Sequence, residues 1–408
     1  MFHRAIAAPA GLLGDPSRRK VAVFCVCQAL SQSGSVMVFA TAGLAGKMLA
    51  TVPALATLPL GVQYVSMMAA TIPASLTMAR IGRRAGFVVG QCFGLIGALV
   101  SAWALVAGEF WALVGAAVAI GVHNAFFQYL RFAAADAASP EFRPKAISYV
   151  MTGGVVAGLL GPELAKRTVD LLAPATFAGA YLALACLCVA NILALQLAPR
   201  LDAAAAVVRG AGRPLTGVVR QPEVVVAVLS AVVGYGLMNL LMVASPLAMA
   251  GCGFAFADAA EALRWHVLGM FAPSFFTGSL IRRFGVLNII AAGLAAMIGC
   301  VAVGLAGTAF VNFLTALFLL GVGWNFMFIG GTTLLAGAYR AEERAMMQGF
   351  NDFLVYSGAA VSSFASGAMT TAFGWRTVNL LALLPLALVA AAIVRLRRRL
   401  RPAAGLRQ

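Results

Sequence analysis

Two short basic loops divide the chain: Met78–Arg84 reads M-A-R-I-G-R-R, and Ile281–Gly285 reads I-R-R-F-G. Each loop lies between two long apolar segments and contains Arg, an apolar residue and Gly in succession. These Arg-x-Gly triplets begin at positions 80 and 283, which are 203 residues apart in a chain of 408. Because this distance is half of the chain, we predict two halves with the same fold.

The most polar internal stretch of the sequence lies near the midpoint, at residues 199–221. We predict that it is a linker on the same side of the membrane as both termini. The halves that it joins are predicted to be residues 1–198 and residues 222–408, each with six helices.

The composition is that of an integral membrane protein. Hydrophobic residues make up 62% of the chain, charged residues 10%, and the mean hydropathy is +0.95. Apolar runs of about 20 residues, the length that crosses a bilayer as a helix, recur along the sequence. The net charge of +16 does not indicate a nucleic-acid-binding protein, because the basic residues occur in short runs between apolar segments. We predict attraction to anionic lipid instead.

Twelve membrane-spanning helices can be placed, so we predict an all-α protein. Their expected ranges are 20–46, 55–79, 85–107, 110–134, 144–166, 174–198, 222–249, 259–281, 284–306, 308–334, 345–371 and 374–395.

The basic residues predict how the helices are oriented. Of the 29 Lys and Arg residues, 24 fall before, after or between segments on one side of the membrane. The other side has only Lys47, Lys166, Arg167, Arg264 and Arg376. Because basic residues collect in cytoplasmic loops, both termini are predicted to be cytoplasmic.

Four residues of the seventh and eighth segments form a candidate metal site. Met238 and Met242 are four residues apart, as are His266 and Met270, so each pair shares one helix face. Met238 and His266 each lie about 16 residues, or about 24 Å, from the cytoplasmic ends of these antiparallel helices. Thioether and imidazole ligands favour soft ions such as Cu(I). The alternative is that the Met residues fill the core and His266 is hydrogen-bonded to a neighbour.

Other polar or sulfur-containing residues extend this interpretation. Met67 and Met68 on the second helix and His123 on the fourth could continue a pathway through the first half. Asp352 on the eleventh helix could carry protons, or it could cap the cytoplasmic end of that helix near Arg344.

The two-half layout with short basic Arg-x-Gly loops resembles the major facilitator superfamily. This resemblance covers the whole chain and implies two six-helix bundles that move about a central site, giving alternating access. The chain departs from the family's loop pattern, because Ala79 and Arg282 stand where the family has an acidic residue. The resemblance therefore does not extend to the cytoplasmic ion pair that this residue usually makes.

The motif M-x-x-x-M followed by H-x-x-x-M resembles the CcoA-like copper importers, a bacterial branch of this superfamily. The resemblance implies that Met238, Met242, His266 and Met270 are copper ligands. Cys252 occupies the outer loop where that family has a Cys involved in thiol chemistry, although it could equally be an ordinary loop residue. The family's partner Cys near the end of the first helix is not evident.

The resemblance implies a multi-pass secondary transporter in the bacterial cytoplasmic membrane. It would import copper, as Cu(I), for haem–copper oxidase assembly and deliver it to a cytoplasmic acceptor. Copper would be the substrate, no cofactor is expected, and the protein is not expected to be an enzyme. The absence of a Walker loop excludes ATP-driven pumping.

Three other functions remain open. The same branch includes riboflavin importers, and Tyr64, Phe126, Phe127, Trp324 and Phe328 could stack on a flat ring. A second alternative is a membrane scaffold or sensor that binds copper without transporting it. Export is the third, because the charge distribution does not determine the direction of transport.

Overall fold

The computed structural model describes residues 17–138, 150, 152–198, 215–340 and 343–404. In the first half, the helices and one short 3₁₀ helix are α1 (Ser17–Leu49), η2 (Pro53–Leu55), α2 (Leu58–Ile81), α3 (Arg83–Ala107), α4 (Phe110–Phe127), α5 (Leu130–Ala137), α7 (Gly153–Thr168) and α8 (Ala178–Gln196). In the second half they are α9 (Leu215–Val219), α10 (Pro222–Gly251), α11 (Phe256–Phe271), α12 (Ser274–Phe284), α13 (Val286–Ala306), α14 (Phe310–Ala336) and α15 (Arg344–Ala404).

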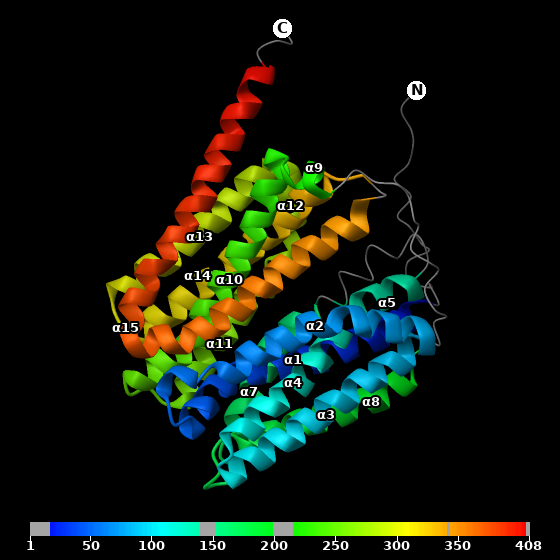
Figure 1. The fold of residues 1–408 in the computed structure, drawn as a ribbon, viewed down its shortest axis with the longest axis vertical. Helices are drawn as coiled ribbons and strands as arrows, with labels where there is room; N and C mark the ends of the chain where they lie inside the picture. Colours follow the sequence, from blue (N-terminus) through cyan, green and yellow to red (C-terminus); the bar gives the residue numbers. More distant parts are fainter. Residues whose placement is uncertain (1–16, 139–149, 151, 199–214, 341–342, 405–408) are drawn as a thin grey trace, which may run out of the picture.

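The helices form two groups that pack side by side. Figure 1 shows α1–α8 on one side of the molecule and α10–α15 on the other. Contacts between the groups come mainly from α7 against α11 and from α2 against the first part of α15. The predicted linker lies largely outside the described residues, so the division at residues 198 and 222 stays a prediction.

Within the described residues, nine helices are long and apolar enough to cross a membrane. The difference from the twelve predicted spans has three sources. The fifth span lies partly outside the described residues, at 144–149 and 151, and its described helix α7 has 16 residues. The eighth span is broken into α11 and α12 at Ala272–Pro273. The last two spans are continuous in α15, which bends at Gly374. The fourth span was predicted to run to residue 134, but α4 ends at Phe127 and a separate helix, α5, begins at Leu130. The other spans are found within a few residues of their predicted ranges.

The two Arg-x-Gly loops have the same backbone conformation. Gly82 has φ 85° and ψ 154°, and Gly285 has φ 84° and ψ 148°. A side chain at either position would be strained, because this region of backbone conformation is open essentially only to Gly. Each Gly ends one helix and begins the next, so the loop is as short as the sequence predicted. This shared geometry supports the predicted internal duplication.

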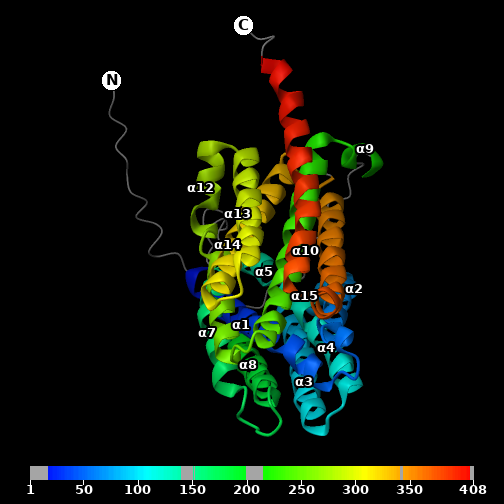
Figure 2. The ribbon, with the colours of Figure 1, turned by 90° about the vertical axis from the view of Figure 1, so that its left-hand side faces the viewer.

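The molecule has two ends, which are defined by where its helices begin and end. The terminal face is the end at which α1 and α10 begin and α15 ends. The far face is the opposite end, at which α10 ends and α11 begins. Figure 2 shows the last turns of α15 extending beyond the neighbouring helices at the terminal face.

Candidate functional site

A cavity lies between the two halves and is lined by both of them. It encloses about 980 Å³ of space, including the part that is open to solvent. The lining residues of the first half are Gln28, Gln32, Val36, Phe39, Tyr64, Gln128 and Gly154. Those of the second half are Tyr235, Met238, Met242, Val267, Met270, Phe271, Trp324, Phe328, Asp352 and Tyr356. A cavity shared by both bundles is where a rocking transporter holds its solute.

Aromatic rings form much of the second-half wall. The rings of Trp324 and Phe328, one turn apart on α14, are stacked with centroids 5.2 Å apart and an interplanar angle of 10°. Tyr235 of α10 packs edge-on against both, at 5.9 Å from Trp324 and 5.8 Å from Phe328. Phe271 and Tyr356 extend this cluster, the former against Trp324 and the latter against Tyr235. Together these rings offer a rigid apolar surface to a ligand.

The first half contributes a second aromatic pair. Phe39 of α1 and Tyr64 of α2 are stacked, with centroids 6.1 Å apart and planes 18° apart. Both line the same cavity as Trp324 and Phe328. A planar ligand in this cavity can therefore contact aromatic rings from both halves.

The polar groups of the lining are mostly uncharged. Gln28, Gln32 and Gln128 each supply an amide that can donate and accept hydrogen bonds. Asp352 is the one acidic residue among the described lining residues, and this part of the lining contains no Lys, Arg or His. The set is suited to a neutral ligand with several hydrogen-bonding groups.

The structure brings three of the four predicted copper ligands to this cavity. Met238, Met242 and Met270 are buried and line it. His266 is fully buried but is not part of the lining, because its ring faces α14. Its Nδ1 lies 2.8 Å from the carbonyl oxygen of Leu317.

The hydrogen bond of His266 determines which nitrogen is available. Because a carbonyl oxygen only accepts, Nδ1 carries the proton and donates it to Leu317. Nε2 then has a free lone pair, and it has no hydrogen-bond partner within the described residues. Histidine ligands are commonly oriented in this way, with one nitrogen bonded to a carbonyl group.

The remaining predicted residues lie in several places. Asp352 lines the cavity, whereas His123 is buried beside α3, with Nδ1 3.1 Å from the carbonyl oxygen of Gly90. Met67 is buried in the core of the first half, and Met68 accepts a hydrogen bond from Ser357 across the two halves. Cys252 is exposed at the far face, where α10 ends.

The aromatic residues named in the sequence divide into two groups. Tyr64, Trp324 and Phe328 line the cavity, whereas Phe126 and Phe127 belong to the core of the first half. Other lining residues were not identified from the sequence: the three Gln residues, Phe39, Tyr235, Phe271 and Tyr356. The three Gln residues could have been predicted as lining residues, because polar side chains within membrane spans tend to face the protein interior.

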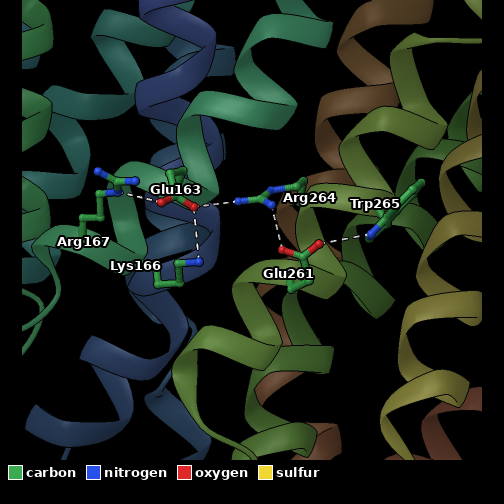
Figure 3. A network of polar contacts seen from close by, with 6 residues as sticks. All are labelled: Glu163, Lys166, Arg167, Glu261, Arg264 and Trp265. Carbon is green, nitrogen blue, oxygen red and sulfur yellow. Dashed lines mark hydrogen bonds and ion pairs between the residues drawn. The ribbon is translucent and has the colours of Figure 1, made fainter.

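An ion-pair network joins the two halves between the cavity and the far face (Figure 3). Arg264 of α11 reaches Glu163 of α7 at 2.8 Å and Glu261 of its own helix at 2.9 Å. Glu163 also pairs with Lys166 at 3.2 Å and with Arg167 at 2.6 Å. The sequence placed Arg264 on the less basic side of the membrane but indicated no partner for it.

A second polar contact joins the halves near the far face. The Thr57 hydroxyl donates to the carbonyl oxygen of Ser363 at 2.6 Å and accepts from the backbone N–H of Gly367 at 3.0 Å. Together with the Glu163–Arg264 pair, it holds the halves together on the far-face side of the cavity.

Comparisons with known proteins agree with this architecture. A family model described as sugar (and other) transporter matches residues 10–197. The riboflavin transporter RfnT of Brucella anthropi is 37% identical over 391 residues, which cover 95% of this chain and 97% of that protein. An uncharacterized MFS-type transporter of Bacillus subtilis, YddS, is 26% identical over 308 residues, covering 71% of this chain and 70% of the relative.

Solved structures share the fold at low sequence identity. A bacterial homologue of the human lysosomal transporter Spinster, in an inward-facing and occupied conformation, has a TM-score of 0.72 at 14% identity and covers 93% of this chain and 96% of its own. The nucleoside transporter NupG has a TM-score of 0.66 at 15% identity, covering 91% of this chain and 98% of its own. The copper-importer branch suggested by the Met and His motifs is not among the families that these matches show. The sequence relatives and the shared fold show that the chain belongs to the major facilitator superfamily and is a membrane transporter of that type.

Proposed function

We propose that this protein transports riboflavin, or a closely similar flat heteroaromatic solute, across a bacterial cytoplasmic membrane by alternating access. The observation that carries the proposal is the lining of the cavity by stacked aromatic pairs from both halves, Phe39–Tyr64 and Trp324–Phe328. The 37% identity to a riboflavin transporter over nearly the whole chain supports the same solute.

The chemistry of riboflavin fits the lining residues. Its three-ring isoalloxazine is planar and apolar on its faces, so it can stack on Trp, Tyr and Phe rings. The edge of the ring system and the hydroxylated side chain need donors and acceptors, which Gln28, Gln32 and Gln128 can supply. Riboflavin is uncharged at neutral pH and therefore needs no cationic partner in the cavity.

The direction of transport follows from orientation, which is itself part of the proposal. If both termini are cytoplasmic, the Glu163–Arg264 and Thr57–Ser363 contacts close the outer side of the cavity. The conformation then faces inward, and import requires that these contacts open to the outside. Solute uptake would be the result of alternation between the two states.

Uptake of labelled riboflavin into cells that cannot make it tests the proposal. Cells carrying the chain should accumulate riboflavin, and Trp324→Ala should reduce uptake more than about tenfold because one wall of the stack is removed. The matched control is Trp111→Ala, at a position that is 68% exposed on the outside of the bundle, and it should leave uptake unchanged. Equal uptake by the two variants would refute the placement of the solute against Trp324.

Cu(I) is a second candidate solute, favoured by one specific observation. The thioethers of Met238, Met242 and Met270 reach the same cavity, and Nε2 of the neighbouring His266 is unpartnered within the described residues. Neutral sulfur and nitrogen ligands suit a soft monovalent ion. Copper import for oxidase assembly and delivery to a cytoplasmic acceptor would follow from this candidate.

Copper and riboflavin uptake should be measured side by side in the same cells. A copper carrier would lose copper accumulation in a Met238→Leu, Met242→Leu double variant, which keeps the side-chain volume but removes both sulfur atoms. Copper binding by purified protein without movement into liposomes would favour the scaffold alternative. If riboflavin alone accumulates, copper is not the solute.

A further inference from the structure

We propose that the groove between the start of α10 and the end of α15 binds the phosphate headgroup of an anionic phospholipid. The groove opens on the outside of the second half at the terminal face and encloses about 850 Å³, including its open part. It shares no lining residue with the central cavity, so its ligand does not depend on which solute is transported.

Three arginines from distant parts of the sequence meet at this groove. Arg220 lies just before α10, while Arg395 and Arg399 lie one turn apart on the same face of α15. All three are exposed, and within the described residues none of them makes an ion pair. Three like charges in one place repel each other unless an anion lies between them. The groove therefore presents a site for a phosphate group.

One other arginine of α15 is used differently. Arg397, on the opposite side of the helix, donates to the carbonyl oxygen of Leu287 and to Oδ1 of Asn288 at 2.5 Å. Its guanidinium fastens α15 to α13. In the part of the chain that the structure describes, none of the three groove arginines makes such a contact. Arg397 thus binds another helix of the protein, whereas Arg395 and Arg399 of the same helix face the groove. This contrast indicates that the groove arginines bind a partner outside the chain.

The depth of the groove matches the surface of a bilayer. From the bend at Gly374 to Arg395, α15 runs 21 residues, which is about 32 Å of helix. The hydrocarbon core of a bilayer is about 30 Å thick. Arg395 thus lies at the level of the lipid headgroups when the bend lies at the opposite membrane surface.

The apolar wall of the groove distinguishes a lipid from a free phosphate ion. Val225, Ala392 and Leu396 line it beside the arginines. Val225 is 46% exposed and lies on the membrane-embedded side of Arg220, where an acyl chain would run. Basic pockets against transmembrane helices at this level are typical binding sites for anionic headgroups.

Native mass spectrometry of the purified chain tests the site. Phosphatidylglycerol and phosphatidylethanolamine are titrated separately, and glycerol 3-phosphate is added as a competitor. We expect at least about tenfold tighter binding of the first phosphatidylglycerol than of phosphatidylethanolamine, because only the former carries a net negative charge. Glycerol 3-phosphate at matched concentration should not displace it.

Charge-matched variants locate the binding. Replacing Arg220, Arg395 and Arg399 with Gln should abolish the preference for phosphatidylglycerol. The control replaces Arg80, Arg282 and Arg283 with Gln, which removes the same charge elsewhere near the terminal face and should keep the preference. Thermal melting shows whether each variant is folded, and Arg399→Gln alone replaces the triple variant if that one is not. The proposal would be overturned if the groove variant and the control lost the preference for phosphatidylglycerol equally, or if glycerol 3-phosphate displaced the bound phosphatidylglycerol.

Discussion

At the scale of single residues, the side chains around the cavity decide what the protein can hold. Aromatic faces from both halves, three amides and one carboxylate favour a planar neutral solute, whereas three thioethers favour a soft ion. These two chemistries share one cavity, but they depend on different residues. They can therefore be separated by substitution.

The Met238→Leu, Met242→Leu double variant should retain riboflavin uptake within about twofold. Leu keeps the apolar volume of the wall, and substitutions of this kind usually cost less than about 1.5 kcal/mol. Labelled riboflavin uptake, corrected for the amount of protein in the membrane, measures the effect. A loss comparable to that of Trp324→Ala would show that the sulfur atoms themselves are needed for riboflavin.

Gly285→Ala should destabilise the protein by about 1–3 kcal/mol, because Ala would be forced into the backbone conformation at φ 84° and ψ 148°. Gly278→Ala is the matched control. A Cβ at either position would meet open space, but Gly278 lies inside the helix α12. The melting temperature in detergent should fall for Gly285→Ala and should stay unchanged or rise for Gly278→Ala. Equal melting temperatures would contradict a conformational role for this Gly.

At the scale of helices, the contacts between α7 and α11 link the cavity to the far face. Glu163 and Arg264 form the ion pair between the halves, and each also has partners on its own helix. Exposed ion pairs are individually worth little, but Arg264 is only 23% exposed and joins two glutamates. The network is thus positioned to bias the two halves toward closure at the far face.

Glu163→Gln should shift the protein toward states that are open at the far face. The change removes the charge that attracts Arg264 but keeps the side-chain shape. Spin labels at Cys252 and at an introduced Leu172→Cys, with the other cysteines replaced by Ser, report the distance between the halves. Pulsed electron paramagnetic resonance measures the distance between the two labels. The population with long distances should be larger in Glu163→Gln than in the unmodified labelled protein.

Glu109→Gln provides the control for this measurement. Glu109 lies at the N-terminal boundary of α4, and its side chain makes no capping hydrogen bond there. The distance distribution of this variant should match that of the unmodified labelled protein. A Glu163→Gln distribution indistinguishable from it would rule out a closing role for the ion pair.

At the scale of the whole molecule, much of the fold could be predicted from the sequence. Long apolar runs, a half-chain repeat and two short Arg-x-Gly loops predict the spans and the duplication, because each depends on local chain properties. The breaks between α4 and α5 and between α11 and α12 were missed, because each falls inside a long and largely apolar run. Only Pro273 marks the second break in the sequence.

The cavity was harder to predict because its lining depends on which face each helix turns inward. His266 shows the limit: helical spacing placed it beside Met270, but its ring packs toward Leu317 of α14. Tyr235 and Phe39 resemble any other aromatic residue of a membrane helix until the packing of the two halves is known. The Met and His motif predicted copper as the solute, whereas RfnT, which is 37% identical to this chain, is a riboflavin transporter.

The most direct test of the proposed function is riboflavin transport by the purified chain in proteoliposomes. We expect saturable accumulation of riboflavin inside the vesicles, lost in Trp324→Ala and retained in Trp111→Ala. Vesicles in which the folded protein moves no riboflavin under any imposed ion gradient, while copper accumulates, would contradict riboflavin as the solute.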